Sequence, residues 1–451
     1  MSKSTDIRVN EAKWSTTQID YRSPMKFGGR IVSDVTLLDV QIDVEDRSGK
    51  RAVGRGSMPL GNVWGWPSQT LDNQQTLARM RELGAAVANA ANELSEFGDP
   101  LQLCTRLSHQ YQALADQVTS AANSPEPMPR LAQLVCGSPT EAALFDAWGR
   151  TAQLNSYNML GSDFVNQDLA TWLGDDFAGE YLDQYTRRQP ADHLPLYHLV
   201  GALDPLTASD LPSRLDDGLP ETLGEWIVAD GLTHLKIKLN GDDLPWDVDR
   251  VVRIDAVATE VQARRHVSHW CYSLDFNEKC QNVQYVLEFL AKLRANSPAG
   301  FERVQYIEQP TSRNLRANPD NVMHEAAKIK PVVIDESLVD LESLLLAREL
   351  GYSGVALKAC KGHSEALLMG AAAQKYGMFL CVQDLTCPGF SFLHSSSLAA
   401  RVNSVSAIEG NGRQYCPAGN EAWKEKYPSM FEITDGKVGT FCLNGVGLGF
   451  E

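Results

Sequence analysis

Eight short apolar runs between residues 196 and 408 constrain the fold more than any other feature of the chain. They are separated by longer stretches with helical spacing. The runs are Leu196–Leu203, Leu235–Leu239, Tyr272–Phe276, Val304–Ile307, Val332–Ile334, Val355–Leu357, Phe379–Val382 and Val402–Ile408. Alternation of this kind is typical of parallel βαβ units, and eight strands is the number that closes a barrel. We therefore expect an α/β fold with a TIM-like (β/α)8-type barrel that begins near residue 194.

The residues before the barrel begin with a small sheet. Alternating apolar residues over residues 31–58, interrupted by a turn that contains Gly49, predict a β-hairpin or meander with one polar face. Loops that carry glycine and proline are expected on either side, at residues 22–29 and 61–68. The second loop holds Trp64 and Trp66, which would line a substrate pocket or fill a domain interface.

Helices are expected between this sheet and the barrel. Helical spacing over residues 71–123 breaks near residues 98–100, which indicates two helices. A proline-bearing linker over residues 121–129 precedes a further helix at about residues 138–160. The tail, residues 423–451, is too short to fold alone and is expected to pack back on the N-terminal region.

Charge and composition exclude several classes of partner. The chain has 451 residues and a formal net charge of −16, and a broadly acidic surface attracts neither nucleic acid nor an anionic membrane. No apolar run approaches the length of a membrane span, and residues 1–14 lack an apolar core. The nine cysteines include no Cys-x-x-Cys pair, which argues against a disulfide framework or a zinc site. We expect a soluble, cytoplasmic protein that acts on a small molecule.

Two lysines lie inside one of the apolar runs. With a side-chain period of two, Leu235, Ile237 and Leu239 share one face of the strand, while Lys236 and Lys238 share the other. Two ordinary lysines on an exposed edge strand would give the same pattern. If the leucine face packs on helices, however, the lysines face the barrel interior, where burial is costly unless carboxylates lie nearby.

Those carboxylates occur at the ends of the following runs. Charged residues recur at intervals of 23 to 37 residues, at or just after the carboxyl ends of the predicted strands: Lys238, Asp275, Glu308, Asp335, Lys358, Asp384 and Glu409. This is the spacing of a βα repeat. In a closed barrel these ends form one rim, where catalytic groups converge.

Three consecutive strands offer Asp275, Glu308 and Asp335 at this rim. Three converging carboxylates repel one another, and together they make an all-oxygen site for a hard cation, most simply Mg²⁺. Lys238 lies one strand before this trio and Lys358 one strand after it. The sequence therefore places an amine on each side of whatever the metal holds.

This arrangement suits proton abstraction next to a carboxylate. A metal-bound carboxylate is acidic at its α-carbon, because the cation neutralises charge on the enediolate that forms. A lysine removes the proton only when it is neutral. Lys236, two residues from Lys238 on the same face, is expected to lower the pKa of Lys238 by like-charge repulsion.

Five motifs in order carry a resemblance to a known family: Lys236-x-Lys238, Asp275-x-Asn277, Glu308-Gln309-Pro310, Asp335-Glu336-Ser337 and Lys358. The set resembles the enolase superfamily (the mandelate racemase and muconate-lactonising enzyme family). Within it, the chain is most similar to the muconate-lactonising and dipeptide-epimerase branch, which has a lysine on either side of the metal. The resemblance implies a (β/α)7β barrel at residues 136–415. It also implies an α+β capping domain at residues 1–135, and a tail at residues 416–451 that packs on it.

The resemblance also implies roles for single residues. It implies Asp275, Glu308 and Asp335 as Mg²⁺ ligands, Lys238 as base, Lys358 as acid or base on the other face, and Lys236 as the residue that tunes Lys238. Glu336 is the alternative third ligand. Asn277, Asp384 and Glu409 would bind substrate or support the site, and the loops around Met25 and Trp64 would supply specificity. Families of this kind often form dimers or octamers, so a homo-oligomer is expected.

Other branches of the superfamily match less well. The mandelate-racemase and sugar-acid-dehydratase branches place a histidine at the seventh strand, paired with an aspartate on the sixth. Here those positions hold Asp384 and Lys358. A structural alternative for Asp384 is an ion pair with Lys358 or Lys361. Lys361 itself is expected on the first turn of the following helix, in solvent.

Three functions stay open at this point. The first is a Mg²⁺-dependent racemase or epimerase that acts on a carboxylate through two opposed lysines. The second is a lyase, such as an acid-sugar dehydratase, or a cycloisomerase on the same scaffold, with Lys358 or Asp384 acting at the β-carbon. The third is a barrel that binds a metabolite without catalysis, although the full set of charged residues argues against it.

Overall fold

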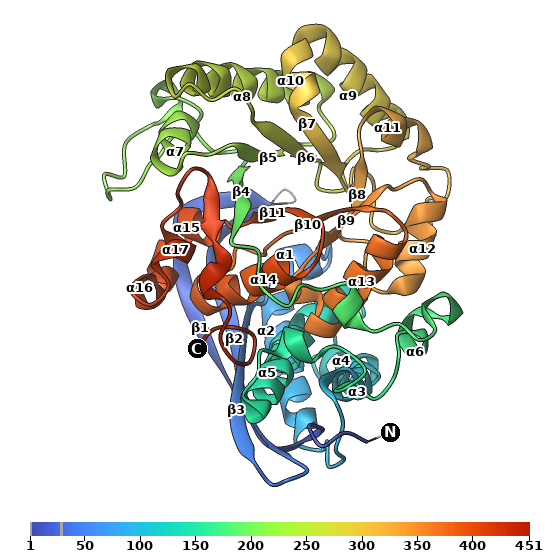
Figure 1. The fold of residues 1–451 in the computed structure, drawn as a ribbon. Helices are drawn as coiled ribbons and strands as arrows, with labels where there is room; N and C mark the ends of the chain where they lie inside the picture. Colours follow the sequence, from blue (N-terminus) through green and yellow to red (C-terminus); the bar gives the residue numbers. More distant parts are fainter. Residues whose placement is uncertain (1, 28–29) are drawn as a thin grey trace.

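The computed structural model describes residues 2–27 and 30–451 and contains a closed ring of eight parallel strands (Figure 1). These strands are β4 (His193–Val200), β5 (His234–Lys238), β6 (Cys271–Asp275), β7 (Val304–Glu308), β8 (Val332–Ile334), β9 (Gly354–Leu357), β10 (Phe379–Val382) and β11 (Val405–Glu409). The ring closes where β11 pairs with β4, with Ile408 opposite Leu196 and Glu409 opposite Tyr197. The predicted barrel and all eight of its strands are confirmed.

Helices connect successive strands and cover the outside of the ring. They are α7 (Leu223–Asp230), α8 (Leu244–Arg264), α9 (Val283–Asn296), α10 (Pro298–Arg303), α11 (His324–Ile329), α12 (Leu341–Glu349), α13 (His363–Lys375) and α14 (Gly389–Arg401). Side chains that point inward, such as Tyr197, Tyr306, Val333 and Cys381, form a small separate core inside the ring. The barrel interior is therefore packed below the rim, as expected for a ring of eight strands.

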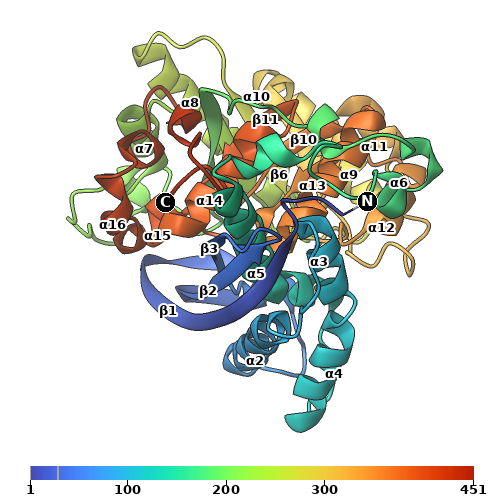
Figure 2. The same ribbon diagram turned by 60° about the horizontal axis from the view of Figure 1, so that its bottom comes forward.

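The N-terminal residues form an antiparallel sheet and a group of helices at one end of the barrel (Figure 2). The strands are β1 (Ile7–Phe27), β2 (Arg30–Asp46) and β3 (Arg51–Pro59), and the helices are α1 (Asn62–Gly65), α2 (Asn73–Ala91), α3 (Pro100–Ser108), α4 (Tyr111–Ala121) and α5 (Arg130–Ala152). The predicted hairpin over residues 31–58 is confirmed. The prediction of a loop at residues 22–29 is wrong as far as Phe27, because β1 continues to that residue, and residues 28 and 29 lie outside the described part of the chain.

Helix α5 joins this N-terminal region to the barrel. It packs on β2, β3 and α2, and also on the 3-10 turn Ala359–Lys361 that follows β9. Glycines allow the close approach of β3, since a Cβ at Gly54 would lie 2.1 Å from the carbonyl oxygen of Ala143. Helix α5 is therefore buried on nearly all sides. The division between residues 135 and 136 that the resemblance implies falls inside it.

The helical region differs from the prediction in number and bounds. Three helices, rather than two, occupy residues 71–123, because α3 and α4 are separated by a short turn after Ser108. Helix α5 begins at Arg130 rather than near residue 138, and ends at Ala152 rather than near residue 160.

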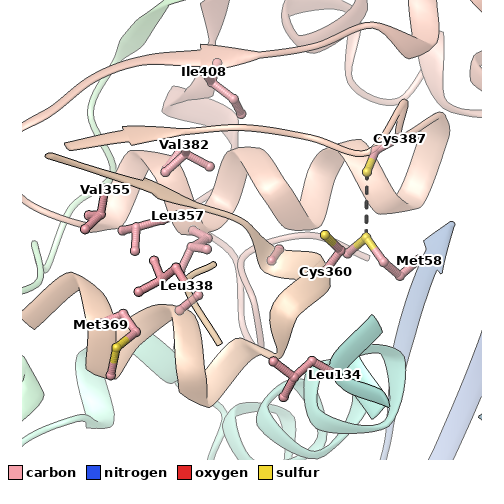
Figure 3. Close-up of a cluster of buried hydrophobic side chains, with 14 of the residues drawn as sticks. Met58, Leu134, Leu338, Val355, Leu357, Cys360, Met369, Val382, Cys387 and Ile408 are labelled. Carbon is pink, nitrogen blue, oxygen red and sulfur yellow. Dashed lines mark hydrogen bonds between the residues drawn. The ribbon is translucent and has the colours of Figure 1, made fainter. Parts of the chain in front are cut away.

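Apolar side chains of the two regions meet in one buried cluster (Figure 3). Met58 of β3 meets Cys387, with 3.7 Å between the two sulfur atoms, and Leu134 of α5 lies in the same cluster. Leu357 and Val382, at the ends of β9 and β10, complete the layer on the barrel side. This layer fixes the N-terminal sheet over the strand ends that carry the charged residues.

The C-terminal tail contacts both parts of the molecule. Strand β12 (Lys437–Gly439) pairs antiparallel with β4, and Phe450 accepts a hydrogen bond from Arg150 of α5 through its carbonyl oxygen at 2.6 Å. The helix α15 (Gly412–Tyr415) precedes the tail, and the tail holds α16 (Glu421–Lys424) and α17 (Pro428–Phe431). The 3-10 turn Pro417–Asn420 lies against β1, so the tail contacts the N-terminal sheet as well as the barrel.

Short elements complete the chain: α6 (Ala170–Leu173) and the 3-10 turns Ser156–Met159, Asp175–Phe177, Leu182–Gln184, Ala208–Asp210, Pro417–Asn420 and Thr440–Cys442. All nine cysteines are free thiols. Within residues 2–27 and 30–451, no helix has both the length and the apolar character needed to cross a lipid bilayer.

Candidate active site at the barrel rim

Seven charged side chains gather at the carboxyl ends of the barrel strands. Lys238, Asp275, Glu308 and Glu409 are the last residues of β5, β6, β7 and β11, whereas Asp335, Lys358 and Asp384 come one or two residues after β8, β9 and β10. All seven are at least nine-tenths buried. Charges buried to this extent must be paired or must bind a ligand, since an isolated buried charge is very costly.

Lys238 and Lys358 lie on opposite sides of the barrel. The strand order around the closed ring is β4 to β11 in sequence, so β5 and β9 are four strands apart among eight. Both lysines line one cavity between the rim and the N-terminal sheet. A molecule bound in that cavity therefore has one lysine side chain on each flank.

The strands between these two lysines carry the three acids. Lys236 reaches two of them, with its Nζ 2.8 Å from Glu308 Oε1 and 3.3 Å from Asp275 Oδ2. Its Nζ also lies 3.0 Å from Glu409 Oε2. Lys238 pairs with Asp275 and donates to Asn277 Oδ1 at 3.1 Å. The alternating pattern of the strand thus brings both lysines onto the carboxylates, as the sequence predicted.

Asp335, the third acid, is held by two lysines. Lys358 Nζ lies 2.9 Å from Asp335 Oδ2, and Lys361 Nζ lies 3.1 Å from Asp335 Oδ1. Lys361 is only 3% exposed, so the expectation that it is solvated is wrong. The reason is the 3-10 turn Ala359–Lys361, which delays the start of α13 to His363 and leaves Lys361 at the rim.

The buried acids differ in their pKa values because they differ in their partners. Burial and the nearby Asp275 raise the pKa of Glu308 to about 8. Burial alone would also raise the pKa of Asp335, but Lys358 and Lys361 lower it to about 2. Burial and the charge of Asp335 raise the pKa of Glu336 well above its ordinary value. The positive charge of the lysines therefore does not fully offset the negative charge of the buried carboxylates.

This excess of oxygen donors bears on the predicted Mg²⁺ site. Among the described residues, no three His, Cys, Asp or Glu side chains are arranged to hold a metal ion as they stand, and lysines contact all three predicted ligands. The donor types nevertheless fit a hard divalent cation, because all are carboxylate oxygens. Glu336 Oε2 is buried without a hydrogen-bond partner. The carboxylates at the rim therefore fit a bound Mg²⁺ ion.

The N-terminal sheet supplies the other wall of the cavity. Trp64 of α1 donates from its indole nitrogen to Glu336 Oε1 at 3.0 Å, and Lys358 Nζ lies 4.4 Å from the centre of the Trp64 ring. Met25 near the end of β1 lines the same cavity. Trp64 therefore lines the cavity and contacts the barrel, whereas Trp66 is buried away from it and donates to Glu126 Oε1 at 2.7 Å. The prediction of a loop at residues 61–68 is wrong over Asn62–Gly65, which forms α1.

Asp384 and Glu409 have different partners at the rim. Asp384 accepts hydrogen bonds from the backbone amides of Thr386, Cys387 and Asn411, rather than an ion pair from Lys358 or Lys361. Burial, followed by repulsion from Glu409, raises the pKa of Asp384 to about 7. Glu409 pairs with Lys236 and accepts from the Asn411 side chain at 2.6 Å.

Sequence reasoning missed two residues that shape the acids. Gln383 donates to Glu308 Oε2, and Lys361 is the second partner of Asp335. The period of two along β10 would have found Gln383, because Cys381 points into the barrel and residue 383 lies on the same face. For Lys361, the only indication in the sequence was its spacing of three residues from Lys358.

Replacing Trp64 tests the hydrogen bond that links the N-terminal region to Glu336 of the barrel. We expect Trp64→Phe to lower the free energy of unfolding by about 1–3 kcal/mol, because Glu336 loses a buried hydrogen bond while the aromatic ring stays in place. Urea denaturation followed by circular dichroism measures this change. Trp14→Phe, at a side chain that is 41% exposed, is the matched control and should change stability by less than about 0.5 kcal/mol. Equal effects of the two substitutions would contradict the assigned hydrogen bond.

Comparisons with known proteins agree with this geometry. A family model described as enolase C-terminal domain-like matches residues 219–451. No curated protein matches the chain in sequence.

Solved structures match over most of their length. An L-Ala-D/L-Glu epimerase from Bacillus subtilis is 18% identical, with 92% of this chain and 91% of that chain covered and a TM-score of 0.60. A muconate lactonizing enzyme from Pseudomonas fluorescens is also 18% identical, with 98% and 96% covered and a TM-score of 0.60. A dipeptide epimerase from Enterococcus faecalis, in complex with Mg and the dipeptide L-Leu-L-Tyr, is 16% identical, with 98% and 99% covered and a TM-score of 0.62. At these identities the likeness concerns the fold.

Proposed function

Because the chain belongs to the enolase C-terminal domain-like family, we propose that it removes the α-proton of a carboxylate substrate with Mg²⁺ as cofactor and returns a proton on the opposite face, as a racemase or epimerase. The observation that carries this proposal is the pair Lys238 and Lys358, four strands apart in the ring and lining one cavity. Racemisation needs one proton-transfer group on each face of the α-carbon.

Mg²⁺ would be held by Asp275, Glu308 and Asp335, with Glu336 as the alternative to Asp335. Bound there, the ion would neutralise negative charge that develops on the substrate carboxylate as the α-proton leaves. The solved dipeptide epimerase with Mg supports this assignment by its fold. The unpartnered oxygen of Glu336 supports it from this chain's own residues.

The lysines divide the proton transfers between them. Lys238 takes the proton from one face. Lys236 remains charged, because the attraction of Glu308 and Glu409 raises its pKa well above the ordinary value even though burial alone would lower it. Burial also disfavours the charged form of Lys358, but Asp335 more than compensates and raises its pKa. In this arrangement Lys358 returns a proton to the other face, and in the reverse direction the two lysines exchange roles.

A lyase or cycloisomerase is the second candidate. Asp384 favours it, since this carboxyl group lines the cavity and its pKa of about 7 suits a group that gives or takes a proton at neutral pH. In such a reaction Asp384 would assist at the β-carbon while Lys238 acts at the α-carbon. A barrel that only binds a metabolite remains the third. The homo-oligomer and the cytoplasmic location stay predictions from the sequence.

Deuterium exchange separates these candidates. The protein is incubated with Mg²⁺ in D₂O and a panel of carboxylates, and the mass of each recovered acid is measured. For a racemase or epimerase we expect one deuterium at the α-carbon and no change in constitution, together with loss of optical purity. Loss of water or an isomeric product would identify the second candidate, and no exchange with any acid would favour the third.

A further inference from the structure

The wall of the active-site cavity has two chemically different halves. The barrel half carries three lysines and four acids: Lys236, Lys238, Lys358, Asp335, Glu336, Asp384 and Glu409. The half from the N-terminal region is mostly apolar and consists of Tyr21, Met25, Val32, Val35, Pro59, Gly61, Val63, Trp64 and Leu77, with Asp34, Thr36 and Asn62 as its polar members. A substrate anchored by its carboxylate at the barrel therefore points the rest of the molecule at an apolar surface.

Two polar members of the apolar half, Asn62 and Asp34, offer little to an anion. The Asn62 amide already donates to the carbonyl oxygen of Asn73 and to Thr76 Oγ1, at 2.8 and 2.9 Å. Asp34 is itself a carboxylate on β2. A second anionic group on the substrate would therefore face repulsion from Asp34 without gaining a donor from Asn62.

The cations of the cavity are all on the barrel half. Among the described residues, no arginine and no histidine lines it. Lys236 contacts Glu308 and Glu409, and Lys358 contacts Asp335. These ammonium groups lie among the residues proposed for Mg²⁺ and proton transfer, so they are remote from the distal end of a bound substrate. A carboxylate at that distal end would be desolvated without a counter-charge, which is costly.

We infer that the substrate is a monocarboxylate whose side chain is apolar, rather than a dicarboxylate. This inference rests on the proposed function for the placement of the carboxylate at the barrel. The apolar half of the cavity contacts the side chain of the substrate, and Asp34 discriminates against a second acid.

Calorimetric titration of the Mg²⁺-loaded full chain tests it without turnover. The probes are 2-hydroxy-4-methylpentanoate and mandelate, which have apolar side chains, and 2-hydroxyglutarate, which has a second carboxylate. We expect at least one apolar probe to bind about tenfold or more tightly than 2-hydroxyglutarate, since pocket contacts of this size discriminate to that extent. The inference is overturned if neither apolar probe binds more tightly than 2-hydroxyglutarate.

A variant that reverses the preference makes the test sharper. Val63→Arg places a guanidinium at a half-buried position of the apolar half, and we expect it to tighten 2-hydroxyglutarate and to weaken the apolar probes. Val53→Arg, on β3 at a side chain that is 46% exposed, is the matched control and should leave all three affinities unchanged. A Val63→Arg protein that folds, as judged by circular dichroism, and keeps the wild-type order of affinities would contradict the inference.

Failure of this inference and failure of the proposed function give different results. Tight binding of the apolar probes without any deuterium exchange across the carboxylate panel would reject the proton-transfer chemistry and keep the substrate class. Deuterium exchange that is fastest with 2-hydroxyglutarate would keep the chemistry and reject the substrate class.

Discussion

Replacing Lys358 with methionine is expected to slow the interconversion of the two enantiomers of a substrate about 10³-fold, while Lys238 continues to exchange the α-proton of one enantiomer in D₂O. The reason is the position of the two lysines on opposite sides of the ring, because each reaches only one face of the α-carbon. Methionine keeps the length of the side chain and removes the proton-transfer group. Chiral chromatography measures the interconversion, and mass spectrometry of each enantiomer measures the exchange.

The reciprocal variant gives the mirror result. Lys238→Met should abolish exchange of the enantiomer that Lys358→Met still exchanges, and should retain exchange of the other. Both variants are expected to fold, since each acid keeps a second lysine: Asp335 retains Lys361, and Asp275 retains Lys236. Lys292→Met, at a lysine that is 49% exposed on α9, is the control and should behave as wild type. If both variants lost exchange of the same enantiomer, the lysines would serve one face and the racemase proposal would fail.

The rim could be predicted from the sequence because its geometry follows from two simple periods. The period of two along β5 places Lys236 and Lys238 on one face, and the βα repeat places one strand end after another on one edge. These two rules predicted that Asp275 and Glu308 would lie beside the lysines, and the structure has Lys236 in contact with both. Neither rule depends on the loops, which vary freely without disturbing the barrel.

The features of the fold and the site that the sequence did not predict depend on the conformation and hydrogen bonding of the backbone. The strand β1 has few buried apolar residues, and its stability comes from pairing with β2, which leaves no strong pattern in its own sequence. Lys361 was assigned to a helix, but Gly362 has a φ of 103° and interrupts the chain before α13 begins. Asp384 is held by three backbone amides, and the sequence carries no sign of such partners.

Asp275→Asn should remove the stabilisation that Mg²⁺ gives to the folded protein and lower the rate of α-proton exchange about 10³-fold. A ligand that binds only the folded state adds about 2.7 kcal/mol of stability at one hundred times its Kd, so thermal unfolding with and without Mg²⁺ measures binding independently of catalysis. The substitution keeps the shape of the side chain but removes the charge of one of the three carboxylates proposed as ligands.

The same substitution should leave the fold intact in the absence of metal, which makes the loss interpretable. Lys236 keeps Glu308 and Glu409, and Lys238 keeps the side-chain oxygen of Asn277. The pKa of Glu308 should fall toward its ordinary value, because after burial the charge of Asp275 is the largest cause that raises it. Asp249→Asn, on the exposed face of α8, is the matched control and should show the full wild-type shift with Mg²⁺. A Mg²⁺-dependent rise in melting temperature that is as large in Asp275→Asn as in wild type would show that the ion binds elsewhere. The chemistry proposed for the two lysines would then lack the charge that makes the α-proton acidic.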